Sequence, residues 1–147
     1  MTVGEVCTRS VVTAHPDETV VEAAKRMRDR HVGDLLVADT QTRPVGILTD
    51  RDIVVSAVAQ SPEKLDSLLV GDVMSRDLIT ARADDTLDDA LKAMRTRGVR
   101  RLPVVSADGR LEGLVAFDDI LEVMSEEIGE LVGLVAREQK REREVRT

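Results

Sequence analysis

The spacing of hydrophobic and polar positions along the chain follows two periods, one typical of helices and one typical of short buried strands. Apolar side chains three and four positions apart predict amphipathic helices over residues 20–27 and 87–94. Short apolar runs between polar turns predict two hairpins, with strands at 35–38, 45–48, 102–105 and 113–115. β-branched stretches predict one further strand ahead of each helix, over 11–13 and 78–80. Together these elements indicate a mixed α+β fold.

Capping and breaking residues mark where the helices begin and end. Thr19 and Thr86 each follow an acidic turn and are suited to the N-cap or the first turn of the predicted helix. A second helix is expected to begin near Asp50 and, later in the chain, near Asp118. Pro62 should end or interrupt the first of these, because proline lacks the amide hydrogen that a helix needs.

The two sets of elements are copies of one another at a constant offset of 67 residues. Val3-Gly4-Glu5-Val6 returns as Val70-Gly71-Asp72-Val73, and Gly46 returns as Gly113. Further matches at this offset pair Thr13 with Thr80, Asp17 with Asp84, Ala23 with Ala90, Met27 with Met94, Leu35 with Leu102 and Asp52 with Asp119. Such self-similarity indicates two copies of one β-α-β-β-α unit.

The repeat divides the chain into a first copy at 1–60, a linker at 61–69 and a second copy at 70–125. Units of this size bury little surface alone, so the two copies are expected to pack against each other. Residues 126–147 form a tail that is first apolar at helical spacing and then densely charged, which predicts one long helix. Its apolar half either covers the module's own core or pairs with a second subunit.

Composition and charge exclude several classes of protein. No apolar run approaches the roughly 18 residues of a membrane span, and the start of the chain has no basic and apolar leader, so we expect a cytoplasmic protein without a membrane segment. The net charge of −7 disfavours nucleic acid as a partner. Phe117 is the sole aromatic residue, so stacking of bases on aromatic side chains is excluded as well.

Residues with metal-binding or catalytic chemistry are sparse. The single cysteine, Cys7, and the two histidines, His15 and His31, have no partners at metal-ligand spacing, so no metal site is expected. Nucleophile, phosphate-loop and metalloprotease motifs do not occur, and therefore we expect no enzyme activity.

The segments Gly46–Ile53 and Val99–Val105, each within one repeat, resemble the CBS-domain family, and the resemblance extends over residues 3–125. It implies two repeats packed sheet to sheet about a pseudo-twofold axis, with a C-terminal helix added. The resemblance also implies two clefts that commonly bind adenosine-containing ligands, and disc-shaped dimers of modules. No cofactor is required, but AMP, ADP, ATP or S-adenosylmethionine is a candidate regulatory ligand.

The chemistry of residues 46–52 agrees with an adenosyl site. Gly46, followed by Ile47, would let a planar base approach the backbone closely, and Thr49 supplies a hydroxyl near a helix start. Asp52 can accept hydrogen bonds from both ribose hydroxyls. Amides at the start of the following helix favour phosphate. The alternative for Thr49 and Asp52 is that they serve only as helix-capping residues.

The resemblance implies that the second repeat completes this site. Main-chain atoms of its first strand, Leu78, Ile79 and Thr80, would hold the base, and Arg100 and Arg101 would meet the phosphates. The alternative for the two arginines is that they are solvated cations paired with surface carboxylates.

A weaker second site is expected at the equivalent positions, namely Val11, Val12, Thr13, Gly113 and Asp119. Ala116 there replaces the hydroxyl of Thr49. Gly33 and Asp34 replace the two arginines, and a carboxylate near phosphates is unfavourable. The sequence therefore favours one good cleft in a regulatory, homodimeric sensor that signals to a regulated protein. The alternatives are a ligand-free dimerisation module and a nucleic-acid-associated regulator.

Overall fold

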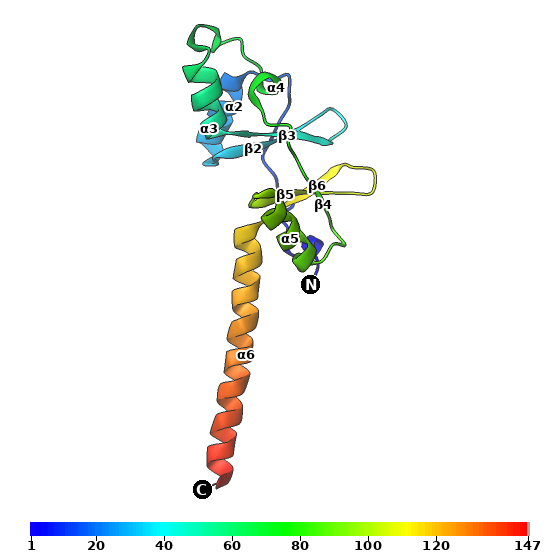
Figure 1. Ribbon diagram of the computed structural model, residues 1–147, viewed down its shortest axis with the longest axis vertical. Helices are drawn as coiled ribbons and strands as arrows, with labels where there is room; N and C mark the ends of the chain where they lie inside the picture. Colours follow the sequence, from blue (N-terminus) through cyan, green and yellow to red (C-terminus); the bar gives the residue numbers. More distant parts are fainter. Residues whose placement is uncertain (147) are drawn as a thin grey trace.

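The structure, a computed structural model, describes residues 1–146 and contains one three-stranded sheet for each repeat (Figure 1). In the first sheet, β1 (Thr13–Ala14) runs parallel to β2 (Asp34–Ala38), which pairs antiparallel with β3 (Pro44–Thr49). The second sheet repeats this order with β4 (Ala81–Arg82), β5 (Arg101–Val105) and β6 (Leu111–Ala116). The predicted α+β fold with two related units is confirmed.

The two amphipathic helices are α2 (Val20–Arg30) and α5 (Leu87–Arg97). Thr19 and Thr86 cap them as predicted, each accepting a backbone hydrogen bond of 3.1 Å on its side-chain oxygen. The other helical segments are α1 (Val3–Val6), α3 (Asp50–Asp52), the π-helix η1 (Ile53–Ala59), the 3₁₀ turn η2 (Pro62–Lys64), α4 (Val70–Val73) and α6 (Phe117–Arg146). Pro62 follows the end of η1, as its missing amide predicts.

The first strand of each repeat lies later in the chain than predicted. Residues 11–13 and 78–80 were expected to form these strands, but β1 begins at Thr13 and β4 at Ala81. Only two residues of each pair with the neighbouring strand. The preceding apolar side chains have other contacts, because Val12 packs on the first core and Ile79 on the second.

Each repeat completes the hydrophobic core of the other. Val3 of α1 is fully buried in the second core, beside Leu102 and Ile120. Val70 and Met74, from the equivalent segment of the second repeat, are buried in the first core. The sequence repeats at 1–60 and 70–125 therefore do not coincide with the two cores, and neither repeat has a complete core of its own.

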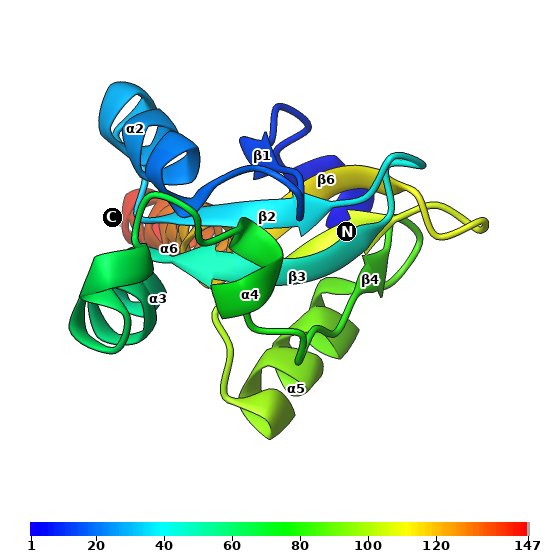
Figure 2. The ribbon, with the colours of Figure 1, turned by 90° about the horizontal axis from the view of Figure 1, so that it is seen from above.

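Equivalent hydrogen bonds relate the two repeats by a pseudo-twofold axis. Gly4 donates its amide hydrogen to the carbonyl of Ala83, and Gly71, 67 positions later, donates to the carbonyl of Pro16, both at 2.9 Å. The sheets lie one above the other in Figure 1 and overlie one another in the view down the long axis in Figure 2. Sheet-to-sheet packing about a pseudo-twofold axis is therefore confirmed.

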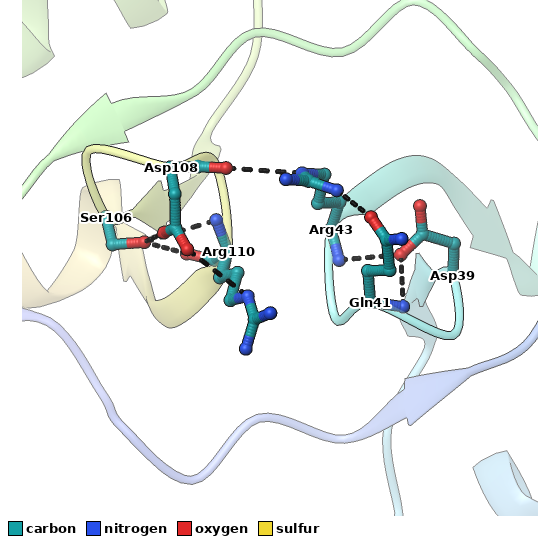
Figure 3. A network of polar contacts seen from close by, with 6 residues as sticks. All are labelled: Asp39, Gln41, Arg43, Ser106, Asp108 and Arg110. Carbon is teal, nitrogen blue, oxygen red and sulfur yellow. Dashed lines mark hydrogen bonds and ion pairs between the residues drawn. The ribbon is translucent and has the colours of Figure 1, made fainter.

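The two hairpin loops meet beside the sheets and tie the repeats together (Figure 3). Arg43 donates a hydrogen bond of 3.2 Å from Nε to the carbonyl of Asp108, and the amide of Leu111 donates to the carbonyl of Thr42 at 2.8 Å. The hydroxyl of Ser106 donates to the Asp108 carboxylate and holds its pKa below the ordinary value. The loops thus fix the relative position of the two sheets at one edge.

The tail forms one helix with the end of the second repeat, as predicted. Ile120 of α6 is buried in the second core and Phe117 packs against that core. Farther along, α6 projects away from the sheets (Figure 1), and every residue from Met124 to Arg146 is exposed. Thr147, the last residue of the predicted tail helix, lies outside the described residues. Within residues 1–146, no helix combines the length and hydrophobicity needed to cross a membrane.

Candidate functional site

A cleft of about 360 Å³ lies between the two repeats, and the end of β3 and the start of β5 are among its walls. We refer to it as the first cleft. Its size lies within the range of about 300–1,000 Å³ typical of small-molecule sites. Its lining comes from both repeats and consists of Asp34, Ile47, Thr49, Asp77, Leu78, Ile79, Val99, Arg100, Arg101, Ala116 and Asp118.

Most of the residues proposed for the adenosyl site line this cleft. They are Ile47 and Thr49 from the first repeat and Leu78, Ile79, Arg100 and Arg101 from the second. Leu78 and Ile79 belong to the extended segment ahead of β4 and are half-buried. Gly46, Asp52 and Thr80 are not part of the lining. The chain thus brings together an apolar wall, a hydroxyl and two guanidinium groups.

Gly46 has a packing role that sequence reasoning missed. A Cβ atom at this position would lie 2.6 Å from the carbonyl oxygen of Ser75 and 2.8 Å from Sδ of Met74. Ile47 and Ser75 exchange two backbone hydrogen bonds of 2.9 Å. The close approach that requires glycine is therefore made by the segment that forms an antiparallel bridge with β3 at Ser75, and the access of a base to the Gly46 backbone stays a prediction.

Thr49 and Asp52 form a reciprocal cap at the start of α3. The amide of Asp52 donates to Oγ1 of Thr49 at 3.1 Å, and the amide of Thr49 donates to Oδ2 of Asp52 at 3.0 Å. This is the capping alternative considered for the two residues. The cap also holds the side chain of Thr49, a residue that lines the first cleft, in one orientation. Ala116, at the equivalent position of the second repeat, has no hydroxyl to form such a cap.

Both arginines of the first cleft are paired with carboxylates. Arg100 lies 2.8 Å from Oδ1 of Asp118, and its guanidinium lies 5.3 Å from the centre of the Phe117 ring. Arg101 is paired with Asp34. The Arg100 pair is exposed, with about three quarters of each side chain accessible, so water weakens it and a phosphate can compete for the guanidinium.

A second cleft of about 400 Å³ lies at the equivalent place across the axis. Its lining consists of Thr8, Ser10, Val11, His31, Val32, Gly33, Asp34, Arg101, Leu114, Ala116, Asp118 and Asp119. Val11 and Asp119 of the predicted second site are among these residues, whereas Val12, Thr13 and Gly113 are not. A Cβ on Gly113 would meet the carbonyl oxygen of Thr8 at 2.7 Å, which repeats the packing of Gly46.

The expected penalty of Asp34 in the second cleft alone is corrected. Asp34 and Arg101 occupy equivalent positions at the starts of β2 and β5, and they pair with each other across the pseudo-twofold axis. As a result, both residues line both clefts. The clefts differ instead in Arg100, which faces the first cleft where the second has Gly33, and in Thr49, which is replaced by Ala116.

Several lining residues of the two clefts escaped prediction. Val99, Asp77 and Asp118 line the first cleft, and Ser10 and Val32 line the second. Asp77 and Val99 are the positions 67 residues beyond Ser10 and Val32. Neither member of these two pairs was in a proposed site, so the offset alone would not have found them; applied to Ile47, however, it gives Leu114, which lines the second cleft.

Two sheet-packed repeats that enclose a pair of equivalent clefts define a tandem-repeat module whose sites lie between the repeats. A family model described as CBS domain matches residues 3–58 and 70–126. The chain therefore belongs to the CBS-domain family.

Similar proteins contain the module in different settings. The protein MK0525 of Methanopyrus kandleri is 40% identical over 123 residues, which are 84% of this chain and 62% of that protein. An inosine-5'-monophosphate dehydrogenase of Methanocaldococcus jannaschii is 37% identical over 118 residues, 80% of this chain but only 22% of the enzyme. The chain thus matches part of the length of each of these two relatives.

Two solved CBS structures contain adenosyl ligands. The CBS domain pair of protein MJ0100, in complex with 5'-methylthioadenosine and S-adenosyl-L-methionine, is 28% identical with a TM-score of 0.72, and the match covers 86% of this chain and 98% of that one. CBSX2 in complex with AMP is 27% identical with a TM-score of 0.73, and the match covers 85% and 96%. Pairs of this fold therefore bind adenosyl ligands.

Proposed function

We propose that this chain is a regulatory module, without catalytic activity of its own, that binds an adenosyl ligand in the first cleft. One observation carries the proposal. The first cleft joins an apolar wall, formed by Ile47, Leu78 and Ile79, to the guanidinium groups of Arg100 and Arg101. An adenosyl ligand has the matching composition, with a planar apolar base at one end and a polar or charged group at the other.

The lining charges favour a ligand with little negative charge. Three carboxylates line the first cleft, and each is paired with an arginine: Asp34 with Arg101, Asp118 with Arg100, and Asp77 with Arg97 at 2.5 Å. A long phosphate chain must displace carboxylates from their guanidinium partners and then lie close to them. We therefore propose that AMP or S-adenosylmethionine binds more tightly than ADP or ATP.

Binding would transmit a signal because the cleft walls belong to different repeats. Thr49 lies at the end of β3 in the first sheet, whereas Ile79 lies ahead of β4 in the second. A ligand that contacts both stabilises one relative arrangement of the sheets over others. We propose that a cytoplasmic homodimer presents this change to a regulated protein.

A second candidate function is a ligand-free dimerisation module. The exposed apolar face of α6, with Ile128, Leu131 and Val132 each about 60% accessible, favours an association role that needs no ligand. Ligand binding separates the two candidates directly.

Thermal denaturation with AMP, ADP, ATP, S-adenosylmethionine and NAD tests the proposal. A ligand at about 100 times its dissociation constant stabilises the fold by roughly 2.7 kcal/mol. Thr49→Ala should weaken the effect of the active ligand, while Thr19→Ala, which removes the same type of cap away from the cleft, should lower stability but leave affinity unchanged. No shift with any of the five compounds would refute the proposal and support the ligand-free module.

A further inference from the structure

The projecting part of α6 carries a broad apolar face exposed to water. Its members are Leu121, Met124, Ile128, Leu131, Val132, Leu134 and Val135, each 41–62% accessible. Helices in proteins owe most of their stability to the packing of such a face on a partner. A contiguous apolar surface of this kind marks an interaction site.

The spacing on this face is that of a coiled coil. Leu121, Met124, Ile128, Leu131 and Val135 follow one another at alternating intervals of three and four residues. These are the a and d positions of two successive heptads. Helices with this repeat pack side by side with their apolar seams in register, so the face fits another helix.

The charges of α6 are separated along its length. Residues 117–136 contain six carboxylates and no lysine or arginine, whereas residues 137–146 contain five basic and three acidic side chains. A parallel pair would place acidic half beside acidic half and basic tip beside basic tip. An antiparallel pair places each basic tip beside the acidic half of the other helix, which is the complementary arrangement.

We propose that α6 pairs antiparallel with α6 of a second copy of this chain, with the centre of the overlap between Gly129 and Glu130. Under this register Ile128 packs on the partner's Leu131 and Met124 on the partner's Val135. Arg137 comes opposite the partner's Glu122, and Arg141 opposite the partner's Asp118. Glu127 comes opposite the partner's Val132 and Glu130 opposite the partner's Gly129, so no acidic pair forms at the centre.

This arrangement specifies which surface forms the homodimer of the proposed function, but it does not depend on ligand binding. Each α6 of 30 residues is about 45 Å long. An antiparallel pair therefore holds the two modules at opposite ends of a helical rod, which differs from the disc-shaped dimer that the family resemblance implied. The apolar seam covers only two heptads, so we expect the dimer to dissociate on dilution.

Light scattering on the full chain, without ligand, tests the association. We expect a concentration-dependent mass that rises from the monomer value of 16.1 kDa to twice that value. Ile128→Glu, at a site already exposed in the monomer, should weaken the dimer by about 100-fold or more by burying a charge in the seam. Gly133→Glu, at a residue with no atom near its would-be Cβ and on the opposite side of the helix, is the matched control and should leave the mass unchanged.

Disulfide cross-linking tests the orientation. In a Cys7→Ser background, Met124→Cys and Val135→Cys are prepared as separate proteins and oxidised alone or mixed. The antiparallel pair predicts a disulfide only in the mixture, because residue 124 of one helix lies opposite residue 135 of the other. Cross-linking of each variant alone would show a parallel pair and overturn the proposal.

Two other outcomes would also overturn the proposed α6 pairing. The first is a monomer at all concentrations, as expected if α6 binds a different protein. The second is an Ile128→Glu variant that remains dimeric. Neither outcome bears on the cleft, since the ligand panel is measured by thermal denaturation of the same variants.

Discussion

Replacing Gly46 by alanine tests whether this glycine serves packing or ligand binding. The added methyl group would lie 2.6 Å from the carbonyl oxygen of Ser75, which is backbone and cannot rotate away. To relieve this steric clash, residues 46–47 must move away from residues 74–75. Two backbone hydrogen bonds of 2.9 Å join Ile47 and Ser75 at this point and would be weakened. Overpacking costs about 1–3 kcal/mol, and each weakened hydrogen bond about 0.5–1.5 kcal/mol. We therefore expect a loss of about 3 kcal/mol in the free energy of unfolding.

The chain has no tryptophan or tyrosine, so unfolding is best followed by far-ultraviolet circular dichroism in urea and on heating. For a domain of this size, a loss of about 3 kcal/mol lowers Tm by about 6–12 °C. Gly113→Ala should behave similarly, because its methyl group would lie 2.7 Å from the carbonyl oxygen of Thr8. Gly129→Ala is the control, since nothing lies within 4 Å of its Cβ and alanine favours the helix.

A packing role for Gly46 is contradicted if Gly46→Ala keeps the stability of the parent to within about 0.5 kcal/mol, the range of an ordinary surface substitution. Should such a stable variant also lose ligand binding, the glycine would serve the close approach of a base, as the sequence alone suggested. A stability loss shared by Gly46→Ala and Gly113→Ala, but absent from Gly129→Ala, assigns both buried glycines to close packing against the segments that bridge to β3 and β6.

Two further predictions concern the cleft. Replacing Arg100 and Arg101 together by alanine should weaken the binding of AMP more than that of adenosine, because guanidinium groups bind phosphate and not the base. Calorimetry with both ligands measures the two affinities, with Arg95→Ala as the control. Equal losses of affinity for AMP and adenosine would contradict this role. Asp52 does not line the first cleft, but its carboxylate holds Thr49, which does. Asp52→Ala should therefore lower affinity by up to about tenfold, since a lost hydrogen bond costs about 0.5–1.5 kcal/mol, whereas Asp119→Ala should change tight binding little. The reverse order of effects in calorimetry would assign the tight site to the second cleft.

The sequence predicted those parts of the fold whose determinants are local. The helices α2 and α5 were predicted because an N-cap threonine and an apolar stripe specify each of them within a dozen residues. The hairpins followed from apolar runs around polar turns. The first strand of each repeat was placed too early, since its position depends on which residues meet β2 or β5, and Leu78 and Ile79 look equally suited to a strand or to a cleft wall.

Contacts between the repeats lay beyond local reasoning. The exchange of α1 and α4 between cores could not be predicted, because Val3 and Val70 carry the same short motif and would fit either core by composition. The ion pairs of Arg100 and Arg101 depend on tertiary placement as well. The repeat does constrain one contact. Equivalent residues of the two repeats that lie close to the pseudo-twofold axis must contact each other, and Asp34 and Arg101 are such an equivalent pair.

The Asp34–Arg101 pair makes the two clefts interdependent. Both side chains line both clefts, so the guanidinium of Arg101 cannot approach a phosphate in the first cleft without weakening its contact with Asp34. The freed carboxylate then adds unpaired negative charge to the second cleft, where Gly33 supplies no compensating cation. A phosphate in the first cleft should therefore oppose a phosphate in the second. A ligand with a cationic group, such as a sulfonium, should instead bind more tightly in the second cleft, beside the freed Asp34. The Asp34–Arg101 pair thus makes binding in the two clefts cooperative or anticooperative, depending on the charges of the two ligands.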